Sequence, residues 1–185
     1  MKIITIPHKT LRQISKPVEV VDKKLVKFIQ DLQETLAKTR NPQGVGLAAP
    51  QVNNLQRIFV TNVDKKMRSF INPAIIGHSK EIVLGPPKKD NYLEGCLSIP
   101  GVYGPVPRYE WVELEFFAID ATNKMLTKSA EKFEDYEARV VQHELDHLDG
   151  ALFIDYTLRF DLPLYEEDKK TKKLEEVDPS IFKYV

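Results

Sequence analysis

Residues 142–147 read Gln142-His143-Glu144-Leu145-Asp146-His147 and lie within a stretch whose sequence predicts a helix. Asp135 can cap the start of this helix, which we expect to run to about Leu148, and Gly150 is placed to end it. Side chains four positions apart share a helix face, with Cβ atoms about 5–6 Å apart. His143 and His147 can therefore offer ring nitrogens to the same metal ion.

Glu144 follows the first of these histidines and lies on a slightly different part of the helix surface. From there its carboxylate can reach a metal-bound water, take a proton from it and later deliver that proton to a leaving group. The alternative is a surface helix with two incidental histidines, because the H-E-x-x-H pattern also arises by chance. Two of the four histidines of the chain fall here at ligand spacing, and this favours a metal site.

Cys96 is the single cysteine of the chain and stands in the sequence Glu94-Gly95-Cys96-Leu97-Ser98. A lone cysteine is more often a buried, inert thiol than a metal ligand. The neighbouring glycine weakens that interpretation, and a thiolate would supply the third ligand that the helix lacks. Two imidazoles and one thiolate would leave a fourth position for water, which is typical of a catalytic metal site and not of a structural one.

This set of ligands predicts an enzyme that hydrolyses an amide. A metal ion held in this way lowers the pKa of its bound water from about 15.7 toward about 7, which makes that water the nucleophile, and it polarises a carbonyl oxygen. The tetrahedral intermediate needs hydrogen-bond donors aimed at its oxyanion, and the Gln51 side chain and the Leu97 backbone N–H are candidates by position. We expect Glu94 to orient a metal ligand through hydrogen bonds and not to react itself.

Composition and charge exclude several other classes of protein. The 185 residues are 42% hydrophobic and 29% charged, which suits a single catalytic domain over residues 1–185. Basic and acidic residues number 27 each, so no strong field attracts nucleic acid or a membrane surface. With no apolar run of about 18 residues, no secretory signal and one cysteine, we expect a monomeric, soluble protein of the reducing cytoplasm.

The rest of the chain predicts an α+β fold. Asp22 can cap an N-terminal helix whose apolar stripe, from Leu25 to Leu36, we assign to core packing. The glycines and prolines of residues 41–51 predict a loop. Short β-like runs follow at residues 57–61, 69–71, 74–76, 81–84 and 111–119. We expect short, mostly antiparallel strands wrapped around the central H-E-x-x-H helix, and a solvated or helical C-terminal tail over residues 158–185.

Three segments together resemble the peptide deformylases. In chain order they are Gly44-Val45-Gly46-Leu47-Ala48-Ala49-Pro50-Gln51, Glu94-Gly95-Cys96-Leu97-Ser98 and Gln142-His143-Glu144-Leu145-Asp146-His147, and the similar layout covers residues 1 to about 157. The resemblance implies a metallohydrolase that removes the N-formyl group from the formyl-methionine of nascent polypeptides and releases formate. It implies Fe(II) as the native metal, with Zn, Ni or Co able to occupy the site, and the ribosome as a further candidate partner.

The resemblance also implies a role for each matching residue. The matching positions are Cys96, His143 and His147 for the metal ligands, Glu144 for the general acid/base, and Gln51 with the Leu97 amide for the oxyanion donors. Gly46 matches a loop glycine whose carbonyl is expected to bind the substrate backbone. The family lines its methionine pocket at the positions of Val45, Tyr92, Tyr136, Arg139 and Val140.

Some positions depart from the best-known members of that family. Tyrosine and arginine replace small aliphatic residues in the pocket, and Gly101-Val102-Tyr103 replaces an acidic residue and a nearby arginine. We expect Arg108 to be a salt-bridge partner at a strand edge, with a substrate contact as the less favoured alternative. We interpret Asp146 and Asp149 as solvated helix charges.

Two other functions compete with the hydrolase that the resemblance implies. A zinc endopeptidase also carries H-E-x-x-H, but its third ligand normally follows the helix, where Asp155 is the only good candidate. A catalytically idle homologue that only binds formylated peptides is the second alternative, and the intact Glu144 argues against it.

Overall fold

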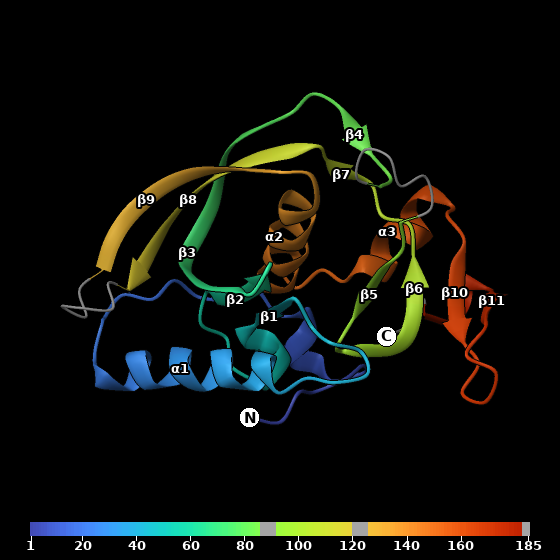
Figure 1. Cartoon of the computed structure of the whole chain (residues 1–185), viewed down its shortest axis with the longest axis horizontal. Helices are drawn as coiled ribbons and strands as arrows, with labels where there is room; N and C mark the ends of the chain where they lie inside the picture. Colours follow the sequence, from blue (N-terminus) through green and yellow to red (C-terminus); the bar gives the residue numbers. More distant parts are fainter. Residues whose placement is uncertain (86–91, 120–125, 183–185) are drawn as a thin grey trace.

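The computed structural model describes residues 1–85, 92–119 and 126–182, in which antiparallel strands surround a central helix (Figure 1). The helices are α1 (Lys23–Ala37), α2 (Asp135–Leu148) and α3 (Phe153–Phe160), with 3-10 turns η1 (Lys9–Arg12), η2 (Ala49–Val52) and η3 (Pro179–Phe182). The strands are β1 (Gly46–Ala48), β2 (Ile58–Val63), β3 (Lys66–His78), β4 (Ile82–Val83), β5 (Glu94–Cys96), β6 (Ile99–Gly104), β7 (Arg108–Tyr109), β8 (Trp111–Ile119), β9 (Leu126–Glu134), β10 (Leu164–Glu167) and β11 (Leu174–Val177). The predicted α+β class, with short antiparallel strands around the H-E-x-x-H helix, is confirmed.

A five-stranded sheet, in the order β1-β2-β3-β8-β9, covers one side of α2 (Figure 1). Its strands alternate between two faces, so that Phe59 and Phe70 meet α2 while Ile58 and Ile71 face the opposite way. The predicted half-buried strand at residues 111–119 follows this rule, since Val112 and other alternate residues are buried. The sheet thereby holds α2 in place through an apolar layer.

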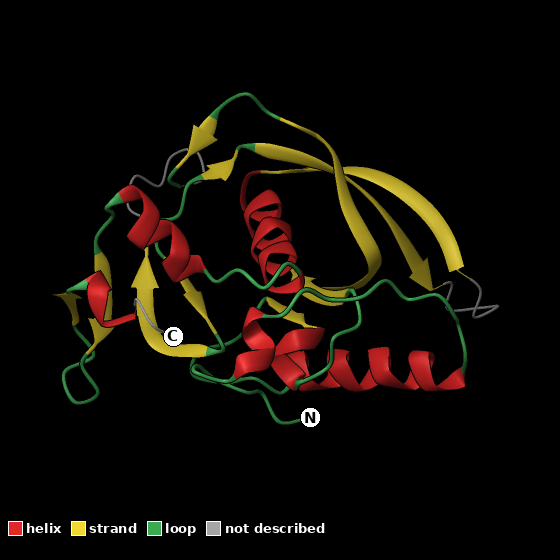
Figure 2. Ribbon diagram, turned by 180° about the vertical axis from the view of Figure 1, so that it is seen from behind, coloured by secondary structure: helices red, strands yellow, loops and turns green. Residues whose placement is uncertain are grey.

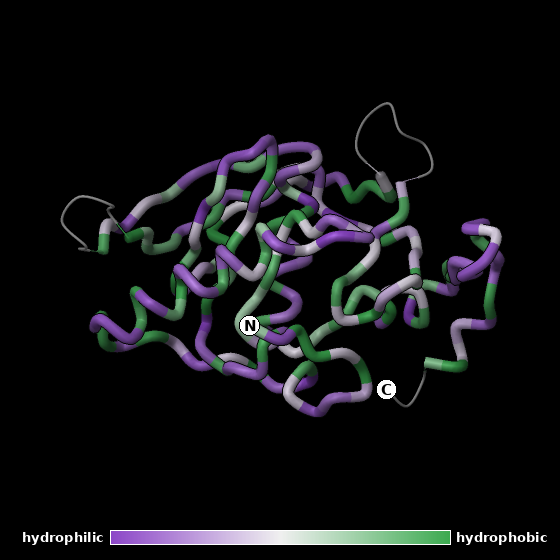
Figure 3. Tube along the Cα trace, turned by 60° about the horizontal axis from the view of Figure 1, so that its bottom comes forward, coloured by the Kyte–Doolittle hydropathy of each residue, from purple (hydrophilic) through white to green (hydrophobic). Residues whose placement is uncertain are grey.

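Helix α1 packs on the other face of this sheet. Asp22 accepts a hydrogen bond from the Leu25 N–H at 2.8 Å, which confirms the predicted cap. The stripe predicted for core packing is buried at Leu25, Ile29, Leu32 and Leu36, and it contacts the face of the sheet that carries Ile58. Figure 3 shows both hydrophobic and hydrophilic residues along α1, as a helix with one solvated face requires.

Helix α2 begins one residue earlier than the predicted cap requires. Its N-cap position is Glu134, whose side chain makes no cap hydrogen bond, and Asp135 is the first helical residue. Strand β9 runs directly into the helix, which leaves no loop in which Asp135 could cap. Acidic side chains in the first turn still suit the positive end of the helix dipole. Gly150 adopts a positive φ of 73° just beyond the helix, as predicted for its end.

Part of the C-terminal tail forms strands of the second sheet, in the order β11-β10-β6-β5, although most tail residues are exposed. Residues 164–167 and 174–177 form a β-hairpin that pairs with β6, where we expected a solvated or helical tail. Leu164 is fully buried among residues that include Val102 and Phe153, so the tail adds to the core. Figure 2 shows α3 and this sheet at the end of the molecule opposite the far ends of β8 and β9.

Three details of the strands differ from the sequence prediction. Residues 46–48, within the predicted loop, form β1 and pair with β2. The predicted runs 69–71 and 74–76 belong to one strand, because a register shift between Ile71 and Ala74 accommodates Pro73 without ending the pairing with β8. Strand β9 was missed because Phe133 is its only fully buried residue, which leaves no apolar alternation to detect. In the described part of the chain, no helix is long and apolar enough to cross a membrane.

Candidate metal centre and active site

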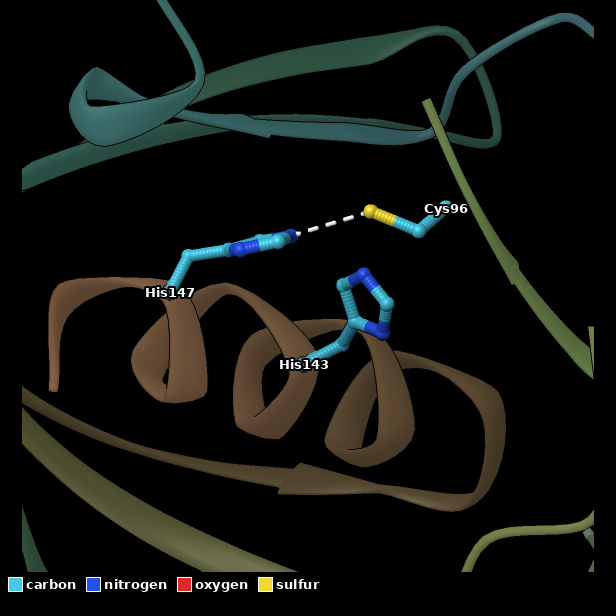
Figure 4. A group of neighbouring side chains, drawn as sticks. All are labelled: Cys96, His143 and His147. Carbon is cyan, nitrogen blue, oxygen red and sulfur yellow. Dashed lines mark hydrogen bonds between the residues drawn. The ribbon is translucent and has the colours of Figure 1, made fainter. Parts of the chain in front are cut away.

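Cys96, His143 and His147 meet at one point beside α2. Their ligand atoms all lie within 4.8 Å of one another, and Cys96 Sγ lies 3.2 Å from His147 Nε2. Figure 4 shows both imidazoles projecting from the same face of α2 toward the sulfur, which comes from the neighbouring strand β5. The predicted thiolate and the two helix histidines are therefore brought together.

The loop around Cys96 holds its sulfur in place. Cys96 ends β5, which forms a tight hairpin with β6. The sulfur accepts a hydrogen bond from the Ser98 N–H at 3.4 Å and one from Gln51 Nε2 at 3.5 Å. These two contacts fix the position of the sulfur beside the histidines.

Glu94 holds His143 in position through the Nδ1 side of its ring. Its Oε2 lies 3.0 Å from His143 Nδ1, and this bond leaves the other ring nitrogen to face the cysteine. Burial opposes a charged imidazole, but hydrogen bonds to Cys96 and Glu94 outweigh it and raise the pKa of His143 well above its usual value. Burial also opposes ionisation of Glu94, yet the charge of Arg108 prevails and holds the pKa of Glu94 well below its usual range. The structure thus gives Glu94 the orienting position that the sequence predicted.

His147 is almost fully buried, with 1% of its surface exposed. Burial lowers the pKa of this imidazole well below its usual value, and the neighbouring His143 lowers it further. A neutral imidazole is the form that binds metals. Its Nδ1 has no hydrogen-bond partner among the described residues.

A divalent metal ion fits these three residues. A thiolate and two imidazoles form a donor set for Zn or another transition metal, and they converge closely enough to share one ion. Asp155, the alternative third ligand, is engaged elsewhere, since it accepts hydrogen bonds from Arg12 Nη1 at 2.6 Å and the Leu152 N–H at 2.8 Å. The donor set therefore uses the upstream cysteine.

Glu144 faces the cavity beside these ligands. The residue is 3% exposed, and burial raises the pKa of its carboxyl to about 7. Its Oε2 has no partner in the described part of the structure, so it is available to a substrate or a water molecule. Gly46 makes this position accessible, because a Cβ there would lie 2.6 Å from the Glu144 Cδ. A buried carboxyl with a pKa near neutrality is suited to exchange protons.

Gln51 lies within hydrogen-bonding distance of the cysteine loop. Its Oε1 accepts from the Ala48 N–H at 2.8 Å, while its Nε2 points to Cys96 Sγ and lies 3.2 Å from Ser98 Oγ. The bond to Ala48 fixes the amide, so that an N–H donor faces the cavity lined by the metal ligands.

One cavity of about 190 Å³ brings the predicted site residues together. The predicted residues that line it are Val45, Gly46, Gln51, Tyr92, Glu94, Cys96, Leu97, Tyr136, Arg139, Val140, His143 and Glu144. His147 is not among the lining residues. Tyr103 also lines the cavity and covers Gly95, where a Cβ would meet the tyrosine ring at 2.7 Å. Sequence reasoning noted Tyr103 only as a departure from the family pattern.

The side-chain pocket has an aromatic wall. The rings of Tyr92 and Tyr136 meet edge to face with centroids 5.8 Å apart, and the Arg139 guanidinium lies 5.4 Å from the centre of Tyr92. Arg139 donates to Glu94 Oε1 and to the Val106 carbonyl, both at 2.8 Å. Its charge is therefore compensated within the protein.

Arg108 and Asp146 form a buried ion pair, which corrects the interpretation of Asp146. The Arg108 side chain is 3% exposed and donates to both oxygens of Glu94, as the salt-bridge prediction expected. Its third contact is to Asp146, which is only 17% exposed and so is not a solvated charge. Asp149 is 56% exposed and pairs with Arg57. The inward position of Asp146 could not be predicted, because its partner Arg108 is distant along the chain.

Comparisons with known proteins agree with this geometry. The family model for polypeptide deformylase matches residues 1–161. A peptide deformylase from Pseudothermotoga lettingae is 45% identical over 154 residues, which is 83% of this chain and 81% of the relative. Among solved structures, a peptide deformylase from Thermotoga maritima matches with a TM-score of 0.71 at 35% identity, over 84% of this chain and 95% of that one. One from Plasmodium falciparum, in complex with an inhibitor, matches with a TM-score of 0.72 at 34% identity, over 86% and 91%. The chain belongs to the polypeptide deformylase family.

Proposed function

We propose that this chain removes the N-formyl group from the formyl-methionine that begins nascent polypeptides, with water as the nucleophile and formate as the product. The observation that carries the proposal is the buried Glu144 carboxyl, with one oxygen free, beside the convergent Cys96, His143 and His147. The family match supports the same reaction.

The residues around the cavity divide the chemistry among them. Glu144 takes a proton from the attacking water and delivers it to the departing amine, for which a pKa of about 7 is well suited. The Gln51 amide and the Leu97 N–H would donate to the oxyanion. The formamide C–N bond breaks when the amine leaves with that proton.

The cavity lies beside two strands that are edge strands of the sheets in the described part of the chain. β1 ends the five-stranded sheet and β5 ends the four-stranded sheet, and Gly46 and Gly95 from these strands both line the cavity. An extended peptide can add to such an edge through main-chain hydrogen bonds. We assign the Gly46 carbonyl to the substrate backbone, and the wall of Val45, Tyr92, Tyr136, Arg139 and Val140 to the methionine side chain.

Cys96, His143 and His147 would hold one divalent ion, and Fe(II) is the metal we propose, with Zn, Ni or Co as substitutes. When bound, the ion would polarise the formyl carbonyl and lower the pKa of the attacking water. We further propose that the protein acts as a monomer in the cytoplasm on chains that emerge from the ribosome. A thiolate ligand suits a reducing compartment.

The test is formate release from a formylated methionyl peptide, measured beside the unformylated and acetylated forms of the same peptide. We expect formate from the formylated peptide alone and no internal cleavage of any of them. An endopeptidase would instead cut internal bonds whether or not the formyl group is present. Replacement of Glu144 by Ala should abolish formate release, and unchanged release would exclude the acid/base role.

A further inference from the structure

A continuous set of polar contacts leads from the metal ligand His143 to the opposite side of α2. Glu94 bonds His143, and Arg108 donates to Glu94 through Nε at 3.0 Å and Nη2 at 2.8 Å. Arg108 Nη1 reaches Asp146 Oδ2 at 2.5 Å, and Tyr156 donates its hydroxyl to Asp146 Oδ1 at 2.9 Å. Tyr156 is thus the last member of a chain of contacts that begins at the metal centre.

Tyr156 touches this chain of contacts twice. Besides its bond to Asp146, its ring lies beneath the Arg108 guanidinium, whose central carbon is 5.0 Å from the ring centroid. A planar guanidinium over an aromatic face is held in orientation as well as in place. Arg108 must keep that orientation to bond both oxygens of Glu94 at once.

Asp146 needs such a restraint because it borders a hollow on the far side of α2. Tyr156, Arg108 and Asp146 all line this hollow, which is separate from the cavity that Glu144 faces. A carboxylate at the edge of a hollow can turn toward water unless a neighbour fixes it. The Tyr156 hydroxyl supplies that neighbour, and its loss would leave one oxygen of Asp146 to solvent.

We propose that Tyr156 is a positioning residue for the metal ligand His143, acting through Asp146, Arg108 and Glu94. The inference rests on the proposed metal site. Partners behind metal ligands fix the orientation of the imidazole and so set the metal affinity of the site. Tyr156 extends this support from β5 to α3.

The experiment compares Tyr156→Phe with Tyr109→Phe in the full-length protein. Tyr109 lines the same hollow, and its ring stacks on His78 with centroids 4.0 Å apart, but no contact links its hydroxyl to Asp146 in the described structure. Each metal-free variant is titrated with Co²⁺ alone, against a competing chelator, and the Co²⁺ absorption bands are recorded.

For Tyr156→Phe we expect Co²⁺ to bind about 10-fold more weakly, with shifted absorption bands, at the weak end of the 10–100-fold range known for such partners. In the formate assay kcat should fall while KM stays unchanged. Tyr109→Phe should match the wild type in every measurement. Asp146→Asn provides a second variant and should weaken Co²⁺ binding at least as much.

Equal affinity and identical Co²⁺ spectra for wild type, Tyr156→Phe and Tyr109→Phe would overturn the inference. A loss common to both phenylalanine variants would also overturn it, since that would indicate a general effect of the hollow. Failure of the proposed function has a different signature: the wild type would bind Co²⁺ tightly but release no formate from formylated peptides.

Discussion

Gly46→Ala tests whether the space around Glu144 is set by a glycine in the neighbouring strand. The added Cβ would lie 2.6 Å from Glu144 Cδ and 2.8 Å from its Cγ, whereas ordinary contacts begin at 3.4 Å. Because the Glu144 Oε1 would lie closer still, the carboxyl must move by more than 3.4 − 2.6 = 0.8 Å, or the strand must yield by that amount. Gly46 is not among the residues with positive φ, so the contact and not the backbone conformation is the obstacle.

A displacement of this size predicts a large catalytic effect and a moderate structural one. A misplacement of about 1 Å costs about 100-fold in rate, and overpacking of a filled site costs about 1–3 kcal/mol of stability. We expect kcat for formate release to fall about 100-fold with KM changed little, because Glu144 acts on the proton and does not hold the peptide. Gly77→Ala is the matched control, since its Cβ would lie 3.2 Å from the Glu113 Oε2, at the end of a flexible side chain, and at least 3.5 Å from its other neighbours.

A double variant shows whether the effect passes through Glu144. In the background of Glu144→Gln, which already lacks the acid/base, Gly46→Ala should cause almost no further loss. A Gly46→Ala enzyme that folds normally and keeps its kcat within threefold would refute the steric reasoning. A rise in KM without loss of kcat would instead indicate that the alanine disturbs the peptide-binding edge of β1.

Three further predictions concern stability and the metal. Burial raises the pKa of Glu144 from 4.5 to about 7, so the metal-free wild type loses stability as pH rises through that range. Glu144→Gln should therefore be more stable than the wild type by about 3 kcal/mol above pH 7 but not below pH 4.5. Equal melting temperatures of the two proteins at pH 8 would contradict this. Arg108→Met leaves Glu94 and Asp146 without their shared cation and should cost about 3–5 kcal/mol in urea unfolding, against less than about 1 kcal/mol for Lys128→Met at an exposed pair. Activity of the Fe(II)-loaded protein should decline in air, because a thiolate bound to oxidisable iron is open to oxidation, whereas activity of the Ni- or Zn-loaded protein should persist. Full activity of the iron form after prolonged exposure to air would show that the sulfur is protected.

The metal ligands and the main helices could be predicted because their signals are local. The two histidines share one turn of α2, and the apolar stripe of α1 has helical spacing. The predicted partner Cys96 is distant along the chain, and its assignment rested on its own motif. The structure brings it to the histidines because β5 ends beside α2.

What could not be predicted depends on pairing between strands and not on the pattern of residues within one strand. β9 is almost entirely polar, and it is a strand because it pairs with β8 along nine successive residues. The tail forms a hairpin because β6 offers Val102 and Tyr103 as pairing partners. Neither segment carries the apolar alternation by which a strand is recognised from its own sequence.

Asp146 shows how the same limit affects the site. It lies between the two histidines of the motif, where a helix position alone suggests an outward, solvated charge. The cation that draws it inward is Arg108, from a two-residue strand that packs beside α2. Arg108 also binds Glu94, the partner of His143, with its remaining nitrogens. Helix α2 therefore carries both the metal ligand His143 and Asp146, the carboxylate that holds Arg108 in position. The two imidazoles are therefore held unequally: His143 has a charged partner on Nδ1, whereas Nδ1 of His147 has no partner in the described structure, so that burial and the Cys96 contact hold this ring.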